Sequence, residues 1–500
     1  MSKEPIKLDR RKFVYAGLGA VAIAAIGIAA YFATRPPEKI VETVVQTQVQ
    51  TQVQTVEKPV EIVKTEVVEK TIPAKVGELD LWWYISWLPE EKIATLEAVR
   101  AYEAETGNKV NLTFYPAVDV NPKVYAAIEA KKVPDLIPNH YWWLGPQLAY
   151  AGQLEDLSDV VDEFKNDLIP GVINGITWYD SKKKATGIYA VPLTLDCVLT
   201  HFWKDFYANS GLETPPEDWD GYFSSIKKAH QITIKDGVYG FGWPVGDTSP
   251  SDVGSIFEQI VRSHGGDMIT PDLKLNVDDP KTKKAVISAL KFYTGLYKEG
   301  FIPEGATTWD DGGNNNAFHT RKVIQVANNT LSIPAYWYSE NKTYYYEKMF
   351  TRAWPFGPEG DKRLEANIRG VLLLKDAPHK EAAKEFLRVF MKKFYKQWII
   401  GNEGRFVPTL KSVVEDPFFQ KGRVTTARPI DPNLPIQPIA LATRPVVPAN
   451  SVVHPAYAQV VGPENIWPKT MMRIITEGLS IETAAEQALN RFKTVFQEYK

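Results

Sequence analysis

The apolar residues of the chain follow three patterns, which divide its 500 residues into three parts. Residues 16–33 form an uncharged run rich in Ala, Ile and Gly. Valines recur along residues 38–75, and short apolar segments alternate with amphipathic ones from residue 78 onward. Short strands that alternate with amphipathic helices are typical of α/β domains. The pattern therefore predicts a membrane segment, a spacer, and a globular α/β part long enough for two lobes.

The first apolar run has the features of an export signal or a membrane anchor. Residues 1–15 form a basic segment, and the uncharged residues 16–34 follow it. A basic flank before an apolar helix orients the N-terminus inside the cell. Residues 9–14 (DRRKFV) resemble a twin-arginine export signal. No small-residue cleavage site stands out and no cysteine follows the run, so we expect a transmembrane signal anchor that holds the binding domain outside the cytoplasmic membrane. A cleaved signal peptide is the alternative.

Residues 35–77 are predicted to form a low-complexity stalk or linker. The tetrapeptide Thr-Gln-Val-Gln occurs twice, and valines recur at steps of three and four residues, which favours a helical or coiled-coil stalk. Pro59 and the many Val and Thr residues oppose a helix, and an extended spacer fits them equally well. Both forms stay open. A stalk that oligomerises would give the chain a second role as a surface protein that binds a partner.

The globular part begins with a pattern that predicts a parallel sheet. Segments 79–85, 110–115 and 134–137 are predicted strands, and segments with helical periodicity separate them. Alternating strands and helices imply parallel strands, with a ligand crevice beyond their carboxyl ends. Tryptophans and tyrosines occur at the ends of the first and third predicted strands. These aromatic side chains are therefore expected at the crevice.

Composition and charge exclude several classes of function. The net charge is −2 and no basic domain stands apart, so the sequence predicts no nucleic-acid partner. The single cysteine, Cys197, excludes an intrachain disulfide and a cysteine-rich metal site. The 14 Trp and 23 Tyr residues often lie beside Gly, Pro and Asn rather than in periodic apolar runs. This placement favours aromatic contacts with a ligand.

Motifs of catalysis are missing from the sequence. HExxH, GxSxG and phosphate-binding loops do not occur, and the glycines of residues 240–246 (GFGWPVG) have the wrong spacing for a dinucleotide fingerprint. Asp310 and Asp311 could in principle hydrolyse a glycoside, but adjacent residues of an extended segment point in opposite directions. We therefore expect a protein that is not an enzyme and needs no cofactor or metal ion. A membrane-anchored glycoside hydrolase stays open as an alternative.

A series of short segments gives the globular part a resemblance to a known family. In chain order they are VPDLI at 133–137, GIYAVPL at 187–193, FWKDF at 202–206, GLETPPEDW at 211–219, AFHTRKVI at 317–324, GVLLL at 370–374 and GNEGRFVP at 401–408. Their order resembles that of the family 1 extracellular solute-binding proteins, which include maltose-binding and other sugar-binding proteins. The resemblance runs from about residue 79 to the C-terminus.

This resemblance implies a two-lobed periplasmic-binding-protein-like α/β fold with a hinge. Lobe 1 would comprise residues 78–195 plus 327–372, and lobe 2 residues 196–326 plus 373–500. It also implies an extracytoplasmic substrate-binding protein that captures a carbohydrate, closes its lobes on it and delivers it to the permease subunits of an ABC transporter. Peptides and polyamines are bound on similar scaffolds and remain alternatives.

A sugar site needs flat aromatic rings and polar side chains that reach its hydroxyls. A glycan on the sequon that begins at Asn328 would conflict with such a site, whereas the sequons at Asn111 and Asn341 raise no such conflict.

We expect Trp82→Ala or Trp243→Ala to weaken binding without unfolding the protein. The candidate ligand-binding residues are Trp82, Trp87, Tyr141, Trp142, Asp196, Trp243, Trp309, Asp310, Asp311, Asn329, Trp337, Glu403 and Arg405.

Overall fold

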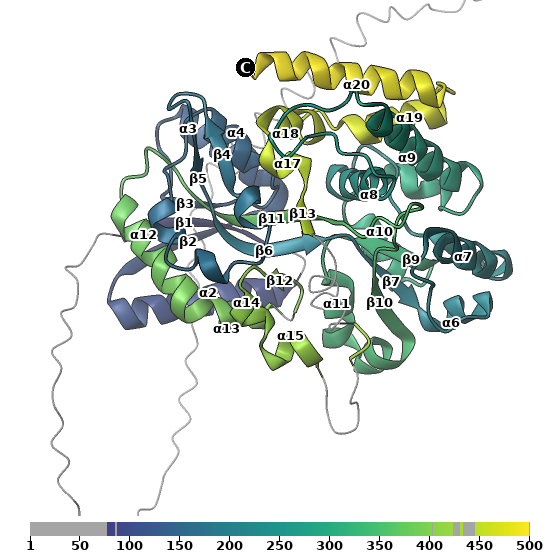
Figure 1. Cartoon of the computed structure of the whole chain (residues 1–500). Helices are drawn as coiled ribbons and strands as arrows, with labels where there is room; N and C mark the ends of the chain where they lie inside the picture. Colours follow the sequence, from purple (N-terminus) through teal and green to yellow (C-terminus); the bar gives the residue numbers. More distant parts are fainter. Residues whose placement is uncertain (1–77, 86–87, 403, 424–430, 434–445, 500) are drawn as a thin grey trace, which may run out of the picture. The chain divides into compact units, whose positions relative to one another are not determined.

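A computed structural model describes residues 78–85, 88–402, 404–423, 431–433 and 446–499 of the chain (Figure 1). The expected anchor (16–34) and stalk (35–77) lie outside the described residues. Within the described residues, no helix has both the length and the apolar composition needed to cross a membrane. The described residues all belong to the unit Thr71–Lys500.

The larger sheet has seven strands, in the order β12-β6-β11-β3-β1-β2, with β13 paired to β11. β1 pairs in parallel with both β2 and β3, as the sequence pattern predicts. Between β1 and β2, α2 begins with a proline in its first turn and ends at Gly107, whose φ of 72° suits a residue without a side chain. The strands are β1 (Glu78–Ile85), β2 (Lys109–Pro116), β3 (Leu136–Pro138), β6 (Val191–Cys197), β11 (Leu364–Leu373), β12 (Val407–Pro408) and β13 (Val446–Pro448).

The smaller sheet has four strands, in the order β10-β7-β9-β8. β7 pairs antiparallel with β10 and β9, and β8 runs parallel to β9. Its strands are β7 (Leu199–Trp203), β8 (Tyr239–Phe241), β9 (Val323–Asn328) and β10 (Met349–Ala353), and a separate hairpin is formed by β4 (Thr177–Asp180) and β5 (Ala185–Ile188).

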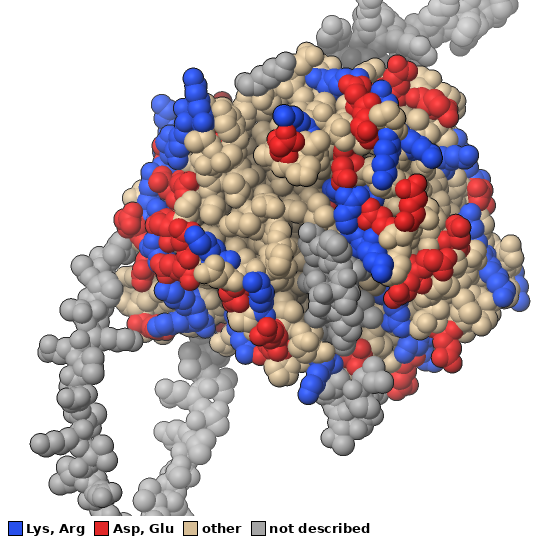
Figure 2. Space-filling view, viewed as in Figure 1, with Lys and Arg blue, Asp and Glu red and all other residues tan. Residues whose placement is uncertain are grey.

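Helices surround both sheets (Figure 1). Those around the larger sheet are α2 (Pro89–Thr106), α3 (Val120–Glu129), α4 (Leu144–Tyr150), α5 (Ser158–Val161), α12 (Lys380–Val389), α13 (Tyr395–Gly401), α14 (Lys411–Val414) and α15 (Pro417–Lys421). The others are α6 (Lys204–Tyr207), α7 (Trp219–Thr233), α8 (Pro250–Ser263), α9 (Pro280–Lys298), α10 (Gly313–His319), α11 (Ser332–Glu340), α17 (Asn450–Val453), α18 (Pro455–Val461), α19 (Ile466–Thr476) and α20 (Ile481–Glu498). On the face in Figure 2, both signs of charge interleave over the outer helices, without a broad basic area.

Each sheet carries its own hydrophobic core, which confirms the two-lobed α/β fold. Core 1 collects buried residues from 79–195 and 366–419, and core 2 collects them mainly from 197–354 and 456–495. Only Val198 separates β6 of the larger sheet from β7 of the smaller one. The chain therefore passes between the lobes at this point, where the sequence predicted its first crossing.

The second half of the chain is divided differently from the sequence prediction. Residues 327–354 were expected in lobe 1 but belong to lobe 2, because β10 pairs with β7 in the smaller sheet. Residues 373–419 were expected in lobe 2 but pack in core 1, because β11 is a strand of the larger sheet and leads into α12. The chain thus returns to lobe 1 at β11 and stays there to about residue 419, whereas the prediction had it return at residue 327 and leave after residue 372. The C-terminal helices α19 and α20 pack on core 2, as predicted.

Trp243 is one of the largest side chains of core 2. Its ring is completely buried, and its Nε1–H donates to Gln325 Oε1 at 2.9 Å. It contacts Phe223 and Trp354 in the same aromatic cluster. The expectation that Trp243 contacts ligand is therefore wrong, because no part of the ring reaches the surface or a cavity.

We expect Trp243→Ala to lower the free energy of unfolding by about 3–5 kcal/mol, because it removes a buried ring and orphans Gln325. Urea denaturation followed by circular dichroism measures the loss. The matched control is Tyr179→Ala, since Tyr179 is 39% exposed, and its effect should stay within about 0.5 kcal/mol. Similar values for the two variants would contradict the placement of Trp243 in the core.

Candidate ligand-binding site

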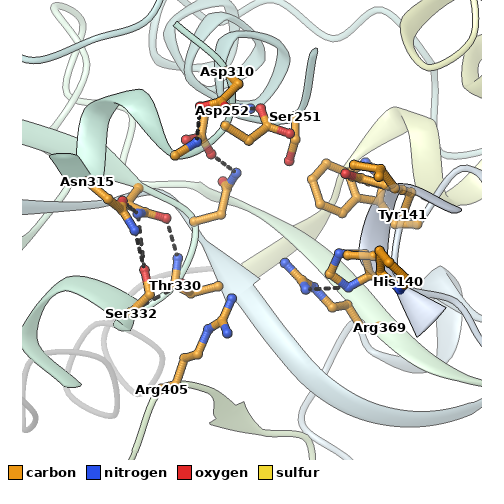
Figure 3. Close-up of a pocket in the computed structure, with 18 of the residues that line it drawn as sticks. His140, Tyr141, Ser251, Asp252, Asp310, Asn315, Thr330, Ser332, Arg369 and Arg405 are labelled. Carbon is orange, nitrogen blue, oxygen red and sulfur yellow. Dashed lines mark hydrogen bonds between the residues drawn. The ribbon is translucent and has the colours of Figure 1, made fainter. Parts of the chain in front are cut away.

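A cavity of about 730 Å³ lies where the two lobes meet. Lobe 1 lines it with the ends of β1 and β2, with residues 140–142 after β3, with Arg369 of β11 and with Arg405. Lobe 2 lines it with residues around the start of α8, with residues 310–312 and 315, and with residues 328–330 and 332 at the end of β9 and just after it. Its volume is within the range of small-molecule sites. Figure 3 shows side chains of both lobes pointing into this space.

A buried arginine organises the lobe 1 wall. Arg369 lies on β11, and its Nε is 2.5 Å from Asp196 Oδ2 on the neighbouring strand β6. Its Nη1 donates to His140 Nδ1 at 3.1 Å (Figure 3). Burial, together with the charge of Arg369, holds the pKa of His140 well below its usual range, so this ring is neutral and can accept that bond. The carboxylate of Asp196 thus balances the positive charge of Arg369 in the lobe 1 wall.

Arg405 provides the second guanidinium of the lobe 1 wall. It forms an ion pair with Glu91 of α2, and both side chains are buried. Burial lowers the pKa of Arg405 to about 10, which still leaves it charged at neutral pH. Its carbonyl accepts the N–H of Leu331 at 3.0 Å. This bond joins the lobe 1 wall to the lobe 2 segment that follows β9.

The lobe 2 wall carries carboxyl groups. Asp252 is buried and accepts from Asn314 Nδ2 at 2.8 Å and from Asn329 Nδ2 at 3.3 Å. Asp311 accepts from Ser249 Oγ at 2.6 Å. Burial raises the pKa of Asp252 well above its usual range, and the charge of Asp311 raises it further. Burial also raises the pKa of Asp311.

A network of amides and hydroxyls continues this wall (Figure 3). Asn328 Nδ2 donates to Asn315 Oδ1 at 2.7 Å and to Ser332 Oγ at 3.3 Å. The Asn328 side chain is only 7% exposed, so the folded protein offers no room for a glycan on it. By contrast, Asn111 and Asn341 are exposed.

Tyr141 is the aromatic residue of the cavity that is only partly buried. Its ring stacks on Trp143, with centroids 4.9 Å apart and planes inclined by 16°. Burial raises its pKa to about 12, so the hydroxyl keeps its proton and can donate. Trp142 also lines the cavity, but it is 97% buried and its Nε1–H donates to Ser451 Oγ at 3.1 Å. Tyr141 therefore offers the better flat surface to a ligand.

The structure brings six of the candidate residues to the cavity: Tyr141, Trp142, Asp310, Asp311, Asn329 and Arg405. Asp196 lies behind Arg369 and supports it. Trp87 and Glu403 lie outside the described residues.

Three further tryptophans pack against the cores instead of lining the cavity. Trp82 packs against core 1, and its ring meets Tyr115 edge to face. Trp309 packs against core 2 and a small satellite cluster. Trp337 stacks on Tyr344, with centroids 4.8 Å apart. All three rings are partly buried by these contacts, and none of them lines the cavity, so the cavity gives these three predictions no support.

Sequence reasoning missed several polar residues of the cavity, above all His140, Asp252, Asn315 and Arg369. One signal was present for Arg369: it is a charged residue within a strand that is buried along its whole length. A charge in such a strand needs a partner or a ligand. His140 directly precedes the aromatic residues that were selected. Asp252 and Asn315 carry no comparable local signal, because both depend on the packing of α8 against α10 and β9.

A family model described as bacterial extracellular solute-binding protein matches residues 88–404, more than half of the chain. The chain belongs to this family. Among curated relatives, this solute-binding protein is 24% identical over 323 residues to a protein of Brucella abortus named as a binding protein. That match covers 63% of this chain and 72% of the relative.

Two solved structures share the fold of this solute-binding protein. A sugar transporter protein from Arthrobacter chlorophenolicus with bound laminaribiose has a TM-score of 0.66 and 19% identity, over 84% of this chain and 99% of the other. An ABC transporter solute-binding protein from Thermotoga lettingae, bound with α-D-tagatose, has a TM-score of 0.65 and 20% identity, with the same coverage. At this level of identity, the likeness establishes the two-lobed fold.

We expect the stability of this solute-binding protein to fall as the pH rises through the folded-state pKa of Asp252. A carboxyl whose pKa is raised by folding stabilises the native state below its unfolded pKa, and this contribution is lost at higher pH. Asp252→Asn should therefore become more stable relative to the wild type between about pH 5 and about pH 8. Denaturant unfolding at several pH values measures the difference. The stability of Asp311→Asn relative to the wild type should change with pH in the same direction. If the difference in free energy of unfolding from the wild type did not depend on pH for either variant, the buried environment of Asp252 and Asp311 would be contradicted.

Proposed function

We propose that this protein captures a carbohydrate in the cavity between its lobes and delivers it to the permease of an ABC-type importer. The observation that carries the proposal is the lining of the cavity: one partly exposed tyrosine ring, two guanidinium groups, carboxyls and amides converge from both lobes. Sugars present C–H faces to aromatic rings and hydroxyls to bidentate polar groups. The ligands named for the two similar structures support the same class of solute.

The division of the cavity between two lobes suggests how binding is coupled to a signal. Lobe 1 contributes Tyr141 and Arg369 to the cavity, whereas lobe 2 contributes Asp252 and Asn329. A ligand that contacts both walls gains most when the lobes approach each other, so it shifts the population toward the closed state. The closed arrangement of the lobes is then the form that the permease recognises.

We further propose that residues 16–34 anchor the protein in the cytoplasmic membrane and that residues 35–77 form the stalk. The membership of an extracellular family supports a binding domain that faces outward. Protease treatment of intact cells tests this proposal, because the binding domain should be released while the anchor stays in the membrane fraction. Recovery of the uncleaved domain only after lysis would contradict the orientation.

Tyr141→Ala should weaken carbohydrate binding about ten-fold or more, because it removes the ring that a sugar face would contact. A thermal-shift screen of mono- and oligosaccharides identifies the ligand first, since a ligand at 100 times its dissociation constant adds about 2.7 kcal/mol. Calorimetric titration then compares the variant with the wild type.

Tyr179→Ala is the matched control, because it removes an exposed tyrosine ring from β4, away from the cavity. Its affinity should equal that of the wild type. Equal affinities for the Tyr141 and Tyr179 variants would contradict the site. If only peptides raised the melting temperature, the solute would be a peptide rather than a carbohydrate. Chemical conversion of the sugar during the titration would indicate that the protein is a hydrolase.

A further inference from the structure

We propose that the solute of this cavity carries a cationic group, as an aminated sugar does, and that the lobe 2 wall holds this group. The inference deepens the proposed function and rests on it. The acidic wall is defined here as the carboxyl groups of Asp252, Asp310 and Asp311, all of which line the cavity. Asp252 is buried, Asp311 is partly buried and Asp310 is exposed, and a positive charge on the solute would be attracted by all three.

Among the described residues, no cationic side chain forms an ion pair with the acidic wall. Within the described residues, neither lysine nor arginine forms an ion pair with Asp252, Asp310 or Asp311. The hydrogen bonds that reach Asp252 and Asp311 come from neutral amide, hydroxyl and backbone groups. Removing carboxylates from water without a counter-charge is costly. The wall therefore stabilises a cation that enters the cavity.

The opposite wall does not supply the missing charge. Arg369 is paired with Asp196, and Arg405 is paired with Glu91. Each guanidinium thus has its own carboxylate on lobe 1. When a carboxyl of the acidic wall ionises, its negative charge on the lobe 2 side therefore has no ion-pair partner among the described residues.

An unused acceptor atom beside the acidic wall points to the same chemistry. Asn329 lines the cavity and is 4% exposed. Its Nδ2 donates to Asp252, which leaves Oδ1 as its acceptor, and this buried oxygen has no hydrogen-bond partner. Buried polar atoms are normally paired in native structures. A donor on the solute would complete this group.

An ammonium group fits these acceptors better than a hydroxyl group does. It brings three donors, no acceptor and a full positive charge, whereas a hydroxyl brings one donor and needs partners for its own lone pairs. Hydrogen bonds between ionised partners are also roughly twice as strong as those between neutral groups. Once ionised, the acidic wall with Asn329 Oδ1 offers only acceptors to the cavity. It therefore selects for the amine.

Binding of such a solute should be linked to release of a proton. Burial raises the pKa of Asp252, so the carboxyl pair tends to retain a proton in the empty site. The titratable groups that act on the pair are Asp310, Arg369, Tyr141 and Tyr293. An arriving ammonium group favours the ionised carboxyl. Affinity for the amine should then rise with pH until the solute itself loses its proton.

The test compares ligands that differ only in this charge. The full chain is titrated calorimetrically with the β-1,4-linked disaccharide of glucosamine, with its N-acetylated form and with spermidine. We expect the aminated disaccharide to bind at least about ten-fold more tightly than the acetylated one. Its affinity should rise between about pH 5 and about pH 7, while that of the acetylated form stays level.

Asp252→Asn should remove this preference and its pH dependence. Asp311→Asn serves as a second variant in case the first folds poorly, which a thermal melt reveals. The control is Asp247→Asn, because Asp247 is exposed, precedes α8 and does not line the cavity. It should keep the preference of the wild type.

The outcomes separate this inference from the proposed function. Tight binding of neutral sugars without preference for the amine would overturn the inference and leave the carbohydrate proposal intact. Binding of spermidine alone would support the cationic group and contradict the carbohydrate. Preference for the amine in all three variants would overturn the role of the acidic wall.

Discussion

The two lobes depend on one strand, β11 (Leu364–Leu373), and on the buried charges that it carries. Arg369 pairs with Asp196 of β6 inside lobe 1, while Glu365 pairs with Arg262 of α8 in lobe 2 at 3.0 Å. A buried charge without its partner is strongly destabilising, so each pair requires that its two elements stay together. The strand thus joins the larger sheet to a helix of the other lobe. It also places one guanidinium at the cavity between them.

The order of elements in the first half of lobe 1 could be predicted from the sequence, because each element there has a local signal. β1 and β2 follow short apolar segments, and α2 ends at a glycine. The return of the chain to lobe 1 could not be predicted in the same way. It depends on the pairing of β10 with β7 and of β11 with β6, which joins residues more than 140 positions apart. The sequence contains no local mark of those partners.

The candidate site shows the same limit at the level of side chains. Aromatic residues are visible in a sequence, but Trp243 is a core residue and Trp337 packs against a small apolar cluster, while Tyr141 reaches the cavity. The polar residues of the cavity were less visible, since the raised pKa of Asp252 depends on the neighbours that bury it. Position in the fold, rather than residue type, decides which ring contacts a solute and which carboxyl stays in water.

Closure of the lobes on a solute would be seen most directly in the distance between the lobes, measured with and without solute. Spin labels at Tyr125 on lobe 1 and Ile232 on lobe 2, both exposed positions, would report this distance by pulsed electron resonance. The buried Cys197 should remain unlabelled. We expect a bound carbohydrate to shorten the distance or narrow its distribution, and Tyr141→Ala to shift this change to higher solute concentration. A solute that binds with high affinity while the distance distribution stays the same would contradict capture by closure.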